Sequence, residues 1–124
     1  MVTAAHATMA GKRLLVAEDE YFIAKGLARH LTAAGAEVVG LTASVSDALW
    51  VVQSERLDGA VLDINLRGDL VYPVADALLE RGVPFVFATG YSASAIPERY
   101  AAIARCEKPV EPETFIQALF GAPS

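Results

Sequence analysis

The sequence has a single cysteine, few basic residues and no long hydrophobic run, and each of these shortages excludes a class of protein. Cys106 has no partner for an internal disulfide, and its position in an apolar run is typical of a small buried residue rather than a nucleophile. Lys and Arg number only 10 against 15 Asp and Glu, and they are scattered, which argues against a nucleic-acid partner. Because no run reaches membrane-spanning length and no signal-peptide pattern is present, we expect a cytoplasmic protein without a membrane partner.

The chain contains enough apolar sequence for one hydrophobic core. It has 124 residues, of which 54% are hydrophobic and 20% are charged, and its net charge of −5 suits a metal cation or a basic partner. We predict a disordered N-terminal tail over residues 1–11 and one domain over residues 12–121. Only Ala122, Pro123 and Ser124 follow the last expected helix, so we expect no output domain.

Several apolar runs end abruptly in a polar or charged side chain. The central run, Gly59 to Leu62, shows no alternation, which is typical of a strand buried on both faces of a parallel sheet, and it ends in Asp63. The other runs are Leu14–Ala17 before Glu18 and Asp19, Phe85–Ala88 before Thr89, and Ile103–Glu107 before Lys108. Because the carboxyl ends of parallel strands meet at one edge, we expect these side chains to share a rim, where ligands bind in open α/β sheets.

Helical patterns alternate with the strands. The predicted strands are Arg13–Ala17, Glu37–Leu41, Gly59–Asp63, Phe85–Thr89 and Ile103–Glu107. The first predicted helix is Glu20–Ala34, and the second begins after a cap that is Thr42, Ser44 or Ser46. The remaining predicted helices are Val71–Arg81, a short Glu98–Ala102, and Glu111–Phe120. The stretch Leu66–Asp69 is predicted to be a loop. This alternation predicts an α/β, flavodoxin-like, doubly wound fold, with a five-stranded parallel sheet in the order 2-1-3-4-5 and helices on both faces.

Individual residues carry further expectations. The predicted buried stripes are Ile23, Leu27 and Leu31 in the first helix and Ala75, Leu78 and Leu79 in the third. Asp19 is expected to cap the first helix, and His30 is expected at the edge of the core. Trp50 lies off the stripe of its helix; we favour packing across the helix flank, and a partner anchor is the alternative.

The rim residues together predict a specific chemistry. Three carboxylates, those of Glu18, Asp19 and Asp63, would repel one another unless a cation joined them, and hard oxygen ligands suit Mg²⁺. A carboxylate near a metal and a positive charge can act as a nucleophile and form an aspartyl-phosphate, which makes Asp63 a candidate acceptor. Lys108 supplies the positive charge, and Thr89 supplies a hydroxyl donor for a phosphoryl oxygen.

The chain resembles the receiver domain of bacterial two-component response regulators from Lys12 to Phe120. The resemblance rests on the pair Glu18-Asp19, on Asp63 and Thr89, and on Lys108-Pro109, in that order. It implies that a histidine kinase or phosphotransfer protein phosphorylates Asp63 in a phosphorelay. It also implies that Asp19, Asp63 and the backbone carbonyl of Asn65 bind Mg²⁺, with Glu18 acting through water, that Lys108 contacts the phosphoryl group, and that the peptide bond before Pro109 is cis.

The chain also departs from the common receiver pattern. Most receivers carry a Met-Pro-x-Met-Asp-Gly loop after the acceptor, where this chain has Leu66–Val71, and Arg105 stands where many have an aromatic residue. The stretch Phe87–Tyr91 resembles the hallmark of the FATGUY subfamily, largely stand-alone receivers paired with HWE or related histidine kinases. Tyr91 either replaces the missing aromatic or packs on the surface as a loop tyrosine.

The leading hypothesis is a single-domain response regulator that signals to an unidentified downstream protein. It would not be an enzyme beyond its own phosphoryl transfer and autodephosphorylation. A metal-dependent phosphatase with Asp63 as nucleophile is an alternative, weakened because haloacid-dehalogenase enzymes have a second Asp where this chain has Asn65. A pseudo-receiver that binds partners without phosphorylation is another. We expect the segment Thr89–Tyr100 to be mobile at rest and to become ordered on phosphorylation.

Overall fold

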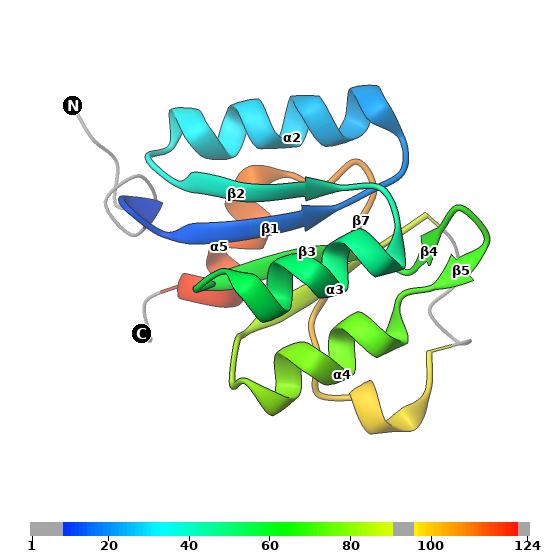
Figure 1. The fold of residues 1–124 in the computed structure, drawn as a ribbon. Coiled ribbons are helices and arrows are strands. Elements are labelled where there is room, and N and C mark those ends of the chain that lie inside the picture. The colour runs from blue at the N-terminus through cyan, green and yellow to red at the C-terminus, as the bar shows by residue number, and fades with distance from the viewer. Residues whose placement is uncertain (1–8, 91–95, 122–124) are drawn as a thin grey trace.

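The fold is a five-stranded parallel sheet with helices on both faces, as the computed structural model of residues 9–90 and 96–121 describes it. The strands are β1 (Arg13–Ala17), β2 (Glu37–Thr42), β3 (Gly59–Asp63), β6 (Phe85–Thr89) and β7 (Arg105–Glu107). They pair in the order β2-β1-β3-β6-β7, which is the predicted order 2-1-3-4-5 (Figure 1). The doubly wound α/β prediction is therefore confirmed.

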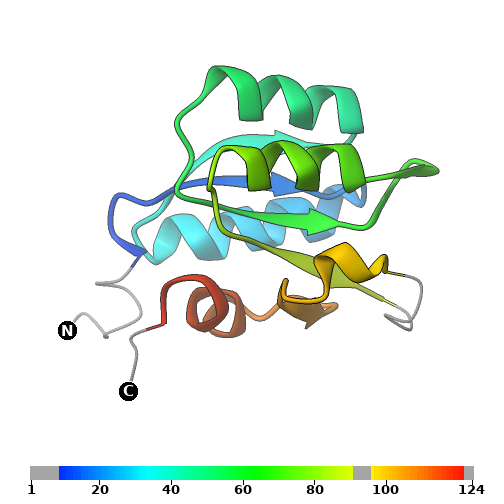
Figure 2. The same ribbon diagram turned by 90° about the horizontal axis from the view of Figure 1, so that it is seen from below.

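Two helices cover each face of the sheet. Helices α3 (Val45–Ser54) and α4 (Tyr72–Glu80) lie on one face, and α2 (Tyr21–Ala33) and α5 (Pro112–Phe120) lie on the other (Figure 2). Leu15, Ala60 and Leu62 face the core under α3 and α4, whereas Leu14, Val16 and Val61 face the core under α2 and α5. Both faces of the sheet are buried, and this explains why the strand sequences show no alternation of apolar and polar residues.

The buried stripes of two helices differ from the prediction at one position each. In α2 the buried residues are Ala24, Leu27 and Leu31, whereas Ile23 is 37% exposed. In α4 Leu78 is fully buried, but Leu79 is 46% exposed. Neighbouring residues in a helix point about 100° apart, so an apolar residue next to the stripe turns out of the core.

Trp50 and His30 are both exposed, contrary to the predictions for them. Trp50 leaves 66% of its surface accessible on α3, so it does not pack across the helix flank. His30 lies in the last turn of α2 and is exposed rather than at the core edge. Cys106, by contrast, is buried in β7 as expected.

A short β-hairpin follows β3 where the sequence analysis predicted a loop. Its strands are β4 (Asn65–Leu66) and β5 (Asp69–Leu70), joined by Arg67 and Gly68. Both turn residues have positive φ, 53° and 89°, as a two-residue type I′ hairpin turn requires. Figure 1 shows the hairpin beyond the end of the main sheet. The paired backbone gives this segment a defined position beside the end of β3.

The predicted fourth helix is a single 3₁₀ turn, η2 (Glu98–Tyr100), and it is firmly packed. Tyr100 is fully buried, its ring stacks on Tyr72 with centroids 5.1 Å apart, and its hydroxyl donates a hydrogen bond to Asp76 of α4. The end of the segment predicted to be mobile is therefore anchored. Residues 91–95, with Tyr91 among them, lie outside the described residues.

The structure also bears on the N-terminal boundary. Residues 1–8 of the predicted tail lie outside the described residues, but Met9 is fully buried and the Gly11 N–H donates to the Gly35 carbonyl at 2.9 Å. The packed domain thus begins by Met9 rather than at Lys12. In the part of the chain that the structure describes, no helix is both long and apolar enough to cross a membrane.

Candidate functional site

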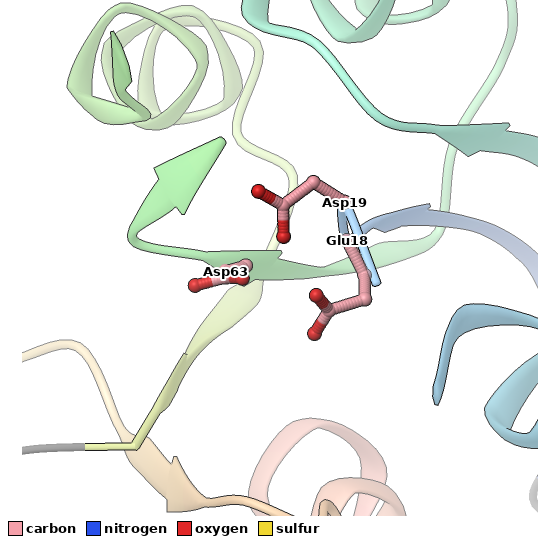
Figure 3. Close-up of side chains that lie close together, drawn as sticks. All are labelled: Glu18, Asp19 and Asp63. Carbon is pink, nitrogen blue, oxygen red and sulfur yellow. The ribbon is translucent and has the colours of Figure 1, made fainter. Parts of the chain in front are cut away.

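Three carboxylates meet at the carboxyl edge of the sheet. Glu18 and Asp19 directly follow β1, and Asp63 is the last residue of β3. Because Ala17 of β1 is in register with Leu62 of β3, the residues after them lie side by side. One oxygen from each of the three carboxylates lies within 4.8 Å of the others. Figure 3 shows the three side chains gathered at this edge.

Lys108 brings a positive charge to two of these carboxylates. Its Nζ lies 2.7 Å from Asp63 Oδ2 and 2.9 Å from Glu18 Oε1. Its backbone N–H donates to the Thr89 carbonyl at 2.9 Å, which continues the pairing of β6 and β7 and fixes where the lysine leaves the sheet. The Lys108–Pro109 peptide bond is cis, as the family resemblance implied.

Burial and hydrogen bonds shift the pKa values of the site in identifiable ways. Burial raises the pKa of Glu18 and outweighs the lowering effects of the Glu20 N–H and of Lys108. Burial alone would lower the pKa of Lys108, but its hydrogen bonds to Asp63 and Glu18 reverse this, and the pKa is raised. A hydrogen bond from the Arg67 N–H is the largest cause of the lowered pKa of Asp19. Lys108 is therefore charged and Asp19 ionised at neutral pH.

Backbone N–H groups of the hairpin also point at the acidic cluster. The Asn65 N–H donates to Asp63 Oδ1 at 3.2 Å, and the Arg67 N–H donates to Asp19 Oδ2 at 2.9 Å. The Asn65 side chain accepts from the Gly68 N–H at 2.8 Å. Asp19 is thus not the predicted helix cap: the residue before α2 is Glu20, whose side chain makes no capping bond. The Asp19 carboxylate contacts the hairpin instead.

A pocket of about 380 Å³ opens at this edge of the sheet. Its polar wall consists of Asp19, Asp63, Asn65, Thr89 and Lys108. Its apolar wall includes Ile64, Leu70, Tyr72 and Ile96. Glu18, the remaining predicted site residue, is only 6% exposed and does not line the pocket, but its carboxylate belongs to the acidic cluster and contacts Lys108. All the residues that the sequence placed on the rim therefore lie at one site.

The donor set fits a hard divalent cation. Three carboxylates and one ammonium leave a formal charge of −2, and carboxylate oxygens with neighbouring carbonyl groups are the ligands that Mg²⁺ takes in half-open sites. Cysteine and histidine, the ligands typical of zinc sites, are not in the cluster that the described residues form.

Sequence reasoning missed two contributors to this site. The hairpin was missed because Arg67-Gly68 is not one of the residue pairs typical of two-residue hairpin turns, such as Asn-Gly or Asp-Gly, and the glycine alone predicts only a turn. Tyr100 was assigned to a poorly packed segment. Its three-aromatic cluster with Tyr72 and Phe87 forms only when η2 folds back on α4, and no local pattern predicts that contact.

Comparisons with known proteins agree with this geometry. SdrG from Sphingomonas melonis Fr1 is 36% identical; the alignment covers 94% of this chain and 96% of SdrG, with a TM-score of 0.75. A response regulator receiver domain protein (CheY-like) from Methanospirillum hungatei JF-1 is 25% identical, with coverage of 87% and 90% and a TM-score of 0.75. The chain belongs to the receiver domains of response regulators. A scan against models of protein families gives no match.

A curated relative of this receiver domain is longer than the aligned region. The transcriptional regulatory protein PdtaR of Mycobacterium tuberculosis is 29% identical over 89 residues. That alignment covers 71% of the receiver chain but only 43% of PdtaR. The chain therefore spans less than half of the length of this relative. Receiver-domain neighbours are signalling proteins rather than classical enzymes, which favours a signalling role over the phosphatase alternative.

Proposed function

We propose that this receiver accepts a phosphoryl group on Asp63 from a histidine kinase or phosphotransfer protein and signals through protein–protein contact. One observation carries the proposal: the Lys108 ammonium lies 2.7 Å from Asp63 Oδ2, and one oxygen each of Glu18 and Asp19 lies within 4.8 Å of an oxygen of Asp63. A nucleophilic carboxylate beside a fixed cation and a cation-binding pair of acids is the arrangement that phosphoryl transfer to aspartate requires.

The transfer exchanges one bond to phosphorus for another. A carboxylate oxygen of Asp63 bonds to the phosphorus of the donor's phosphohistidine while the phosphorus–nitrogen bond breaks. The electron pair of that bond stays on the nitrogen, and the donor leaves as a neutral imidazole because the other ring nitrogen of the phosphohistidine carries a proton. The product is an acyl phosphate on Asp63, and its extra negative charge lies beside Lys108. Positioning and charge stabilisation supply most of the catalysis in such transfers.

Glu18, Asp19, Asp63 and the backbone carbonyl of Asn65 are the residues that we propose for a Mg²⁺ site. When bound, the ion supplies positive charge to the phosphoryl oxygens. Asp19 and Asp63 would ligate it directly and Glu18 through water. The cluster of three carboxylates supports this assignment because, among the described residues, Lys108 is the only positively charged side chain that forms an ion pair with it.

Thr89 and Lys108 are proposed to have separate tasks. Lys108 neutralises the phosphoryl charge, because its ammonium already contacts the acceptor. Thr89 ends β6 and lines the same pocket, so its hydroxyl can donate to a phosphoryl oxygen and carry the change of state to the segment that follows. We further propose that the chain is of the FATGUY type and pairs with an HWE or related kinase, on the basis of Phe87–Gly90.

The proposal is tested by incubation with acetyl phosphate or a phosphorylated histidine kinase, with Mg²⁺, followed by intact-mass analysis. We expect one phosphate per chain in the wild type and none in Asp63→Asn. Asp69→Asn is a matched control, because Asp69 lies in the nearby hairpin but outside the acidic cluster. Absence of labelling with both donors would contradict the proposal and favour a pseudo-receiver, and sustained turnover of small phosphoesters would favour a phosphatase.

A further inference from the structure

The β4–β5 hairpin, residues 65–70, contacts two of the three carboxylates through its backbone. The Asn65 N–H donates to Asp63 and the Arg67 N–H donates to Asp19, at 3.2 Å and 2.9 Å. The second bond joins residues that are 48 positions apart in the sequence. The hairpin therefore links the end of β3 to the residue that follows β1, across the mouth of the site.

The base of the hairpin is fixed to the core. Leu66 is fully buried in the cluster under α3 and α4, and so is Val71, the residue after the hairpin. The Val71 N–H donates to the Ile64 carbonyl at 2.8 Å, which closes the base. Because the base is held, the position of the tip, Arg67 and Gly68, does not depend on contacts made by its own residues' side chains, which are exposed.

The tip has an unusual backbone conformation. Arg67 has a φ of 53° and is the residue other than glycine with positive φ in the described part of the chain. Gly68 follows at 89°, and its N–H is held by the Asn65 side chain. Residues other than glycine disfavour this region of φ, so it is the two-residue turn that holds Arg67 there, and the same turn fixes the position of its N–H.

We propose that the hairpin positions the Asp19 carboxylate for the metal, with the backbone N–H of Arg67 as the positioning group. The bond holds Asp19 Oδ2, so that the carboxylate has one orientation toward Glu18 and Asp63 before any cation arrives. Groups that hydrogen-bond to a metal ligand and fix its orientation raise the affinity of the site. The inference rests on the proposed function, because it assumes that these carboxylates hold Mg²⁺.

Two substitutions at Arg67 separate the backbone from the side chain. Arg67→Pro removes the N–H and requires a φ of about −65°, whereas Arg67→Gly keeps the N–H and accepts positive φ. Both remove the guanidinium charge, so their long-range effect on a cation is the same. We expect calorimetry to show a Mg²⁺ dissociation constant close to the wild-type value for Arg67→Gly and raised about 10- to 100-fold for Arg67→Pro.

A second pair of variants serves if Arg67→Pro does not fold. Gly68→Val and Gly82→Val each place a β-branched residue at positive φ, 89° and 69°, in a position where an added Cβ meets nothing within 4 Å. Only the first lies in the hairpin; the second follows α4. We expect Gly68→Val to weaken Mg²⁺ binding and Gly82→Val to leave it unchanged.

A metal-free measurement tests the hydrogen bond itself. In the protein without Mg²⁺, amide exchange followed by NMR should show Arg67 N–H protected, although the residue is exposed. Asp19→Ala should remove that protection, whereas the buried Val71 N–H, which donates to Ile64, should keep its own. Equal exchange of the Arg67 amide in wild type and Asp19→Ala would overturn the inference.

The outcomes distinguish this inference from the proposed function. If the wild type binds Mg²⁺ and takes phosphate but Arg67→Pro binds Mg²⁺ as Arg67→Gly does, the positioning role is wrong and the function stands. If the variants differ as expected but no phosphate is accepted, the positioning role stands and the function is wrong. Failure of the wild type to bind Mg²⁺ would overturn both.

Discussion

Lys108 controls the charge balance of the site. Its ammonium contacts Glu18 and Asp63, which are 6% and 8% exposed, while the third acid, Asp19, receives its hydrogen bond from Arg67. A buried carboxylate without a partner is costly, so the lysine stabilises the metal-free protein. The same positive charge opposes a cation that approaches the same carboxylates. Lys108 thus acts in opposite directions on the fold and on metal binding.

We expect Lys108→Ala to lower the free energy of unfolding of the metal-free protein by about 1–3 kcal/mol, because two buried carboxylates lose their partner. It should also lower the Mg²⁺ dissociation constant, since the site changes from a formal charge of −2 to −3, and it should impair phosphoryl acceptance. Urea unfolding and calorimetry measure the first two effects. Lys25→Ala, an exposed lysine on α2, is the control and should change neither. Unchanged stability and affinity in Lys108→Ala would refute this account.

Thr89 is expected to report the phosphorylated state rather than to create it. Thr89→Ala should still take phosphate on Asp63 but should not show the change in amide exchange that beryllofluoride, a phosphoryl mimic, produces in the wild type. Thr89→Ser keeps a hydroxyl at the end of β6 and should behave as the wild type. Loss of labelling in Thr89→Ala, with a normal response in Lys108→Ala, would reverse the two roles.

At the scale of elements, η2 packs against α4 behind Tyr72, which lines the pocket of the site. Tyr100 of η2 packs against Tyr72 of α4 and Phe87 of β6, with ring centroids 5.1 Å and 5.6 Å apart. Its hydroxyl donates to Asp76, and Arg99 lies over its ring and contacts Asp76 at 3.4 Å. One buried tyrosine therefore ties the segment after β6 to the helix that follows the hairpin.

The Tyr100–Asp76 hydrogen bond predicts an alkaline dependence of stability. Burial, reinforced by Asp76, raises the pKa of Tyr100 from 10.0 to about 12. The folded state thus favours the neutral phenol, and its contribution is complete below pH 10 and is lost as pH rises through about 12. Tyr100→Phe should lower the free energy of unfolding by about 1–2 kcal/mol at neutral pH. It should also make the decline of that free energy above pH 10 less steep, and urea unfolding at several pH values measures both effects.

Tyr21→Phe is the matched control for this prediction. Tyr21 is 65% exposed on α2, so removal of its hydroxyl should leave the unfolding free energy within about 0.5 kcal/mol of the wild type. An alkaline decline that is equally steep in Tyr100→Phe and in the wild type would show that other groups cause it.

At the scale of the whole molecule, we expect the acidic site to couple metal binding to folding. The three carboxylates come together only in the folded chain, because Asp19 and Asp63 are 44 positions apart in the sequence and belong to the ends of different strands. A cation that binds only this arrangement stabilises the fold by mass action. The net charge of −5 adds a long-range attraction for cations.

We therefore expect Mg²⁺ to raise the melting temperature. At a Mg²⁺ concentration ten times the dissociation constant, the free energy of unfolding should rise by about 1.4 kcal/mol. Asp19→Ala should lose most of it, whereas Glu80→Ala, which removes the same charge from an exposed position on α4, should keep it. Thermal unfolding with and without Mg²⁺ provides the measurement, and a melting temperature indifferent to millimolar Mg²⁺ would contradict the assigned site.

The parts of this protein that its sequence determines by itself are those that depend on local pattern. Unbroken apolar runs predict buried parallel strands, and their order along the chain predicts the doubly wound sheet, so Asp63, Thr89 and Lys108 fall at one rim without any knowledge of contacts. Ser44 was among the predicted caps of α3, and it does accept the Asp47 N–H at 3.2 Å. Strand ends and helix caps are set by residues close in sequence, which is why they could be predicted.

Tertiary structure decided the contacts between residues far apart in sequence. Asp19 was expected to cap a helix, but the hairpin brings the Arg67 N–H to it from 48 positions away. Tyr100 was expected in a mobile segment, but α4 offers it the Tyr72 ring, 28 positions earlier in the chain, and the Asp76 carboxylate, 24 positions earlier. Ile23 and Leu79 are exposed because each lies next to the buried stripe of its helix, and which face of the helix is buried depends on how it packs on the sheet. A periodic pattern contains no information about which distant group will be nearest, because packing of the whole chain sets that distance.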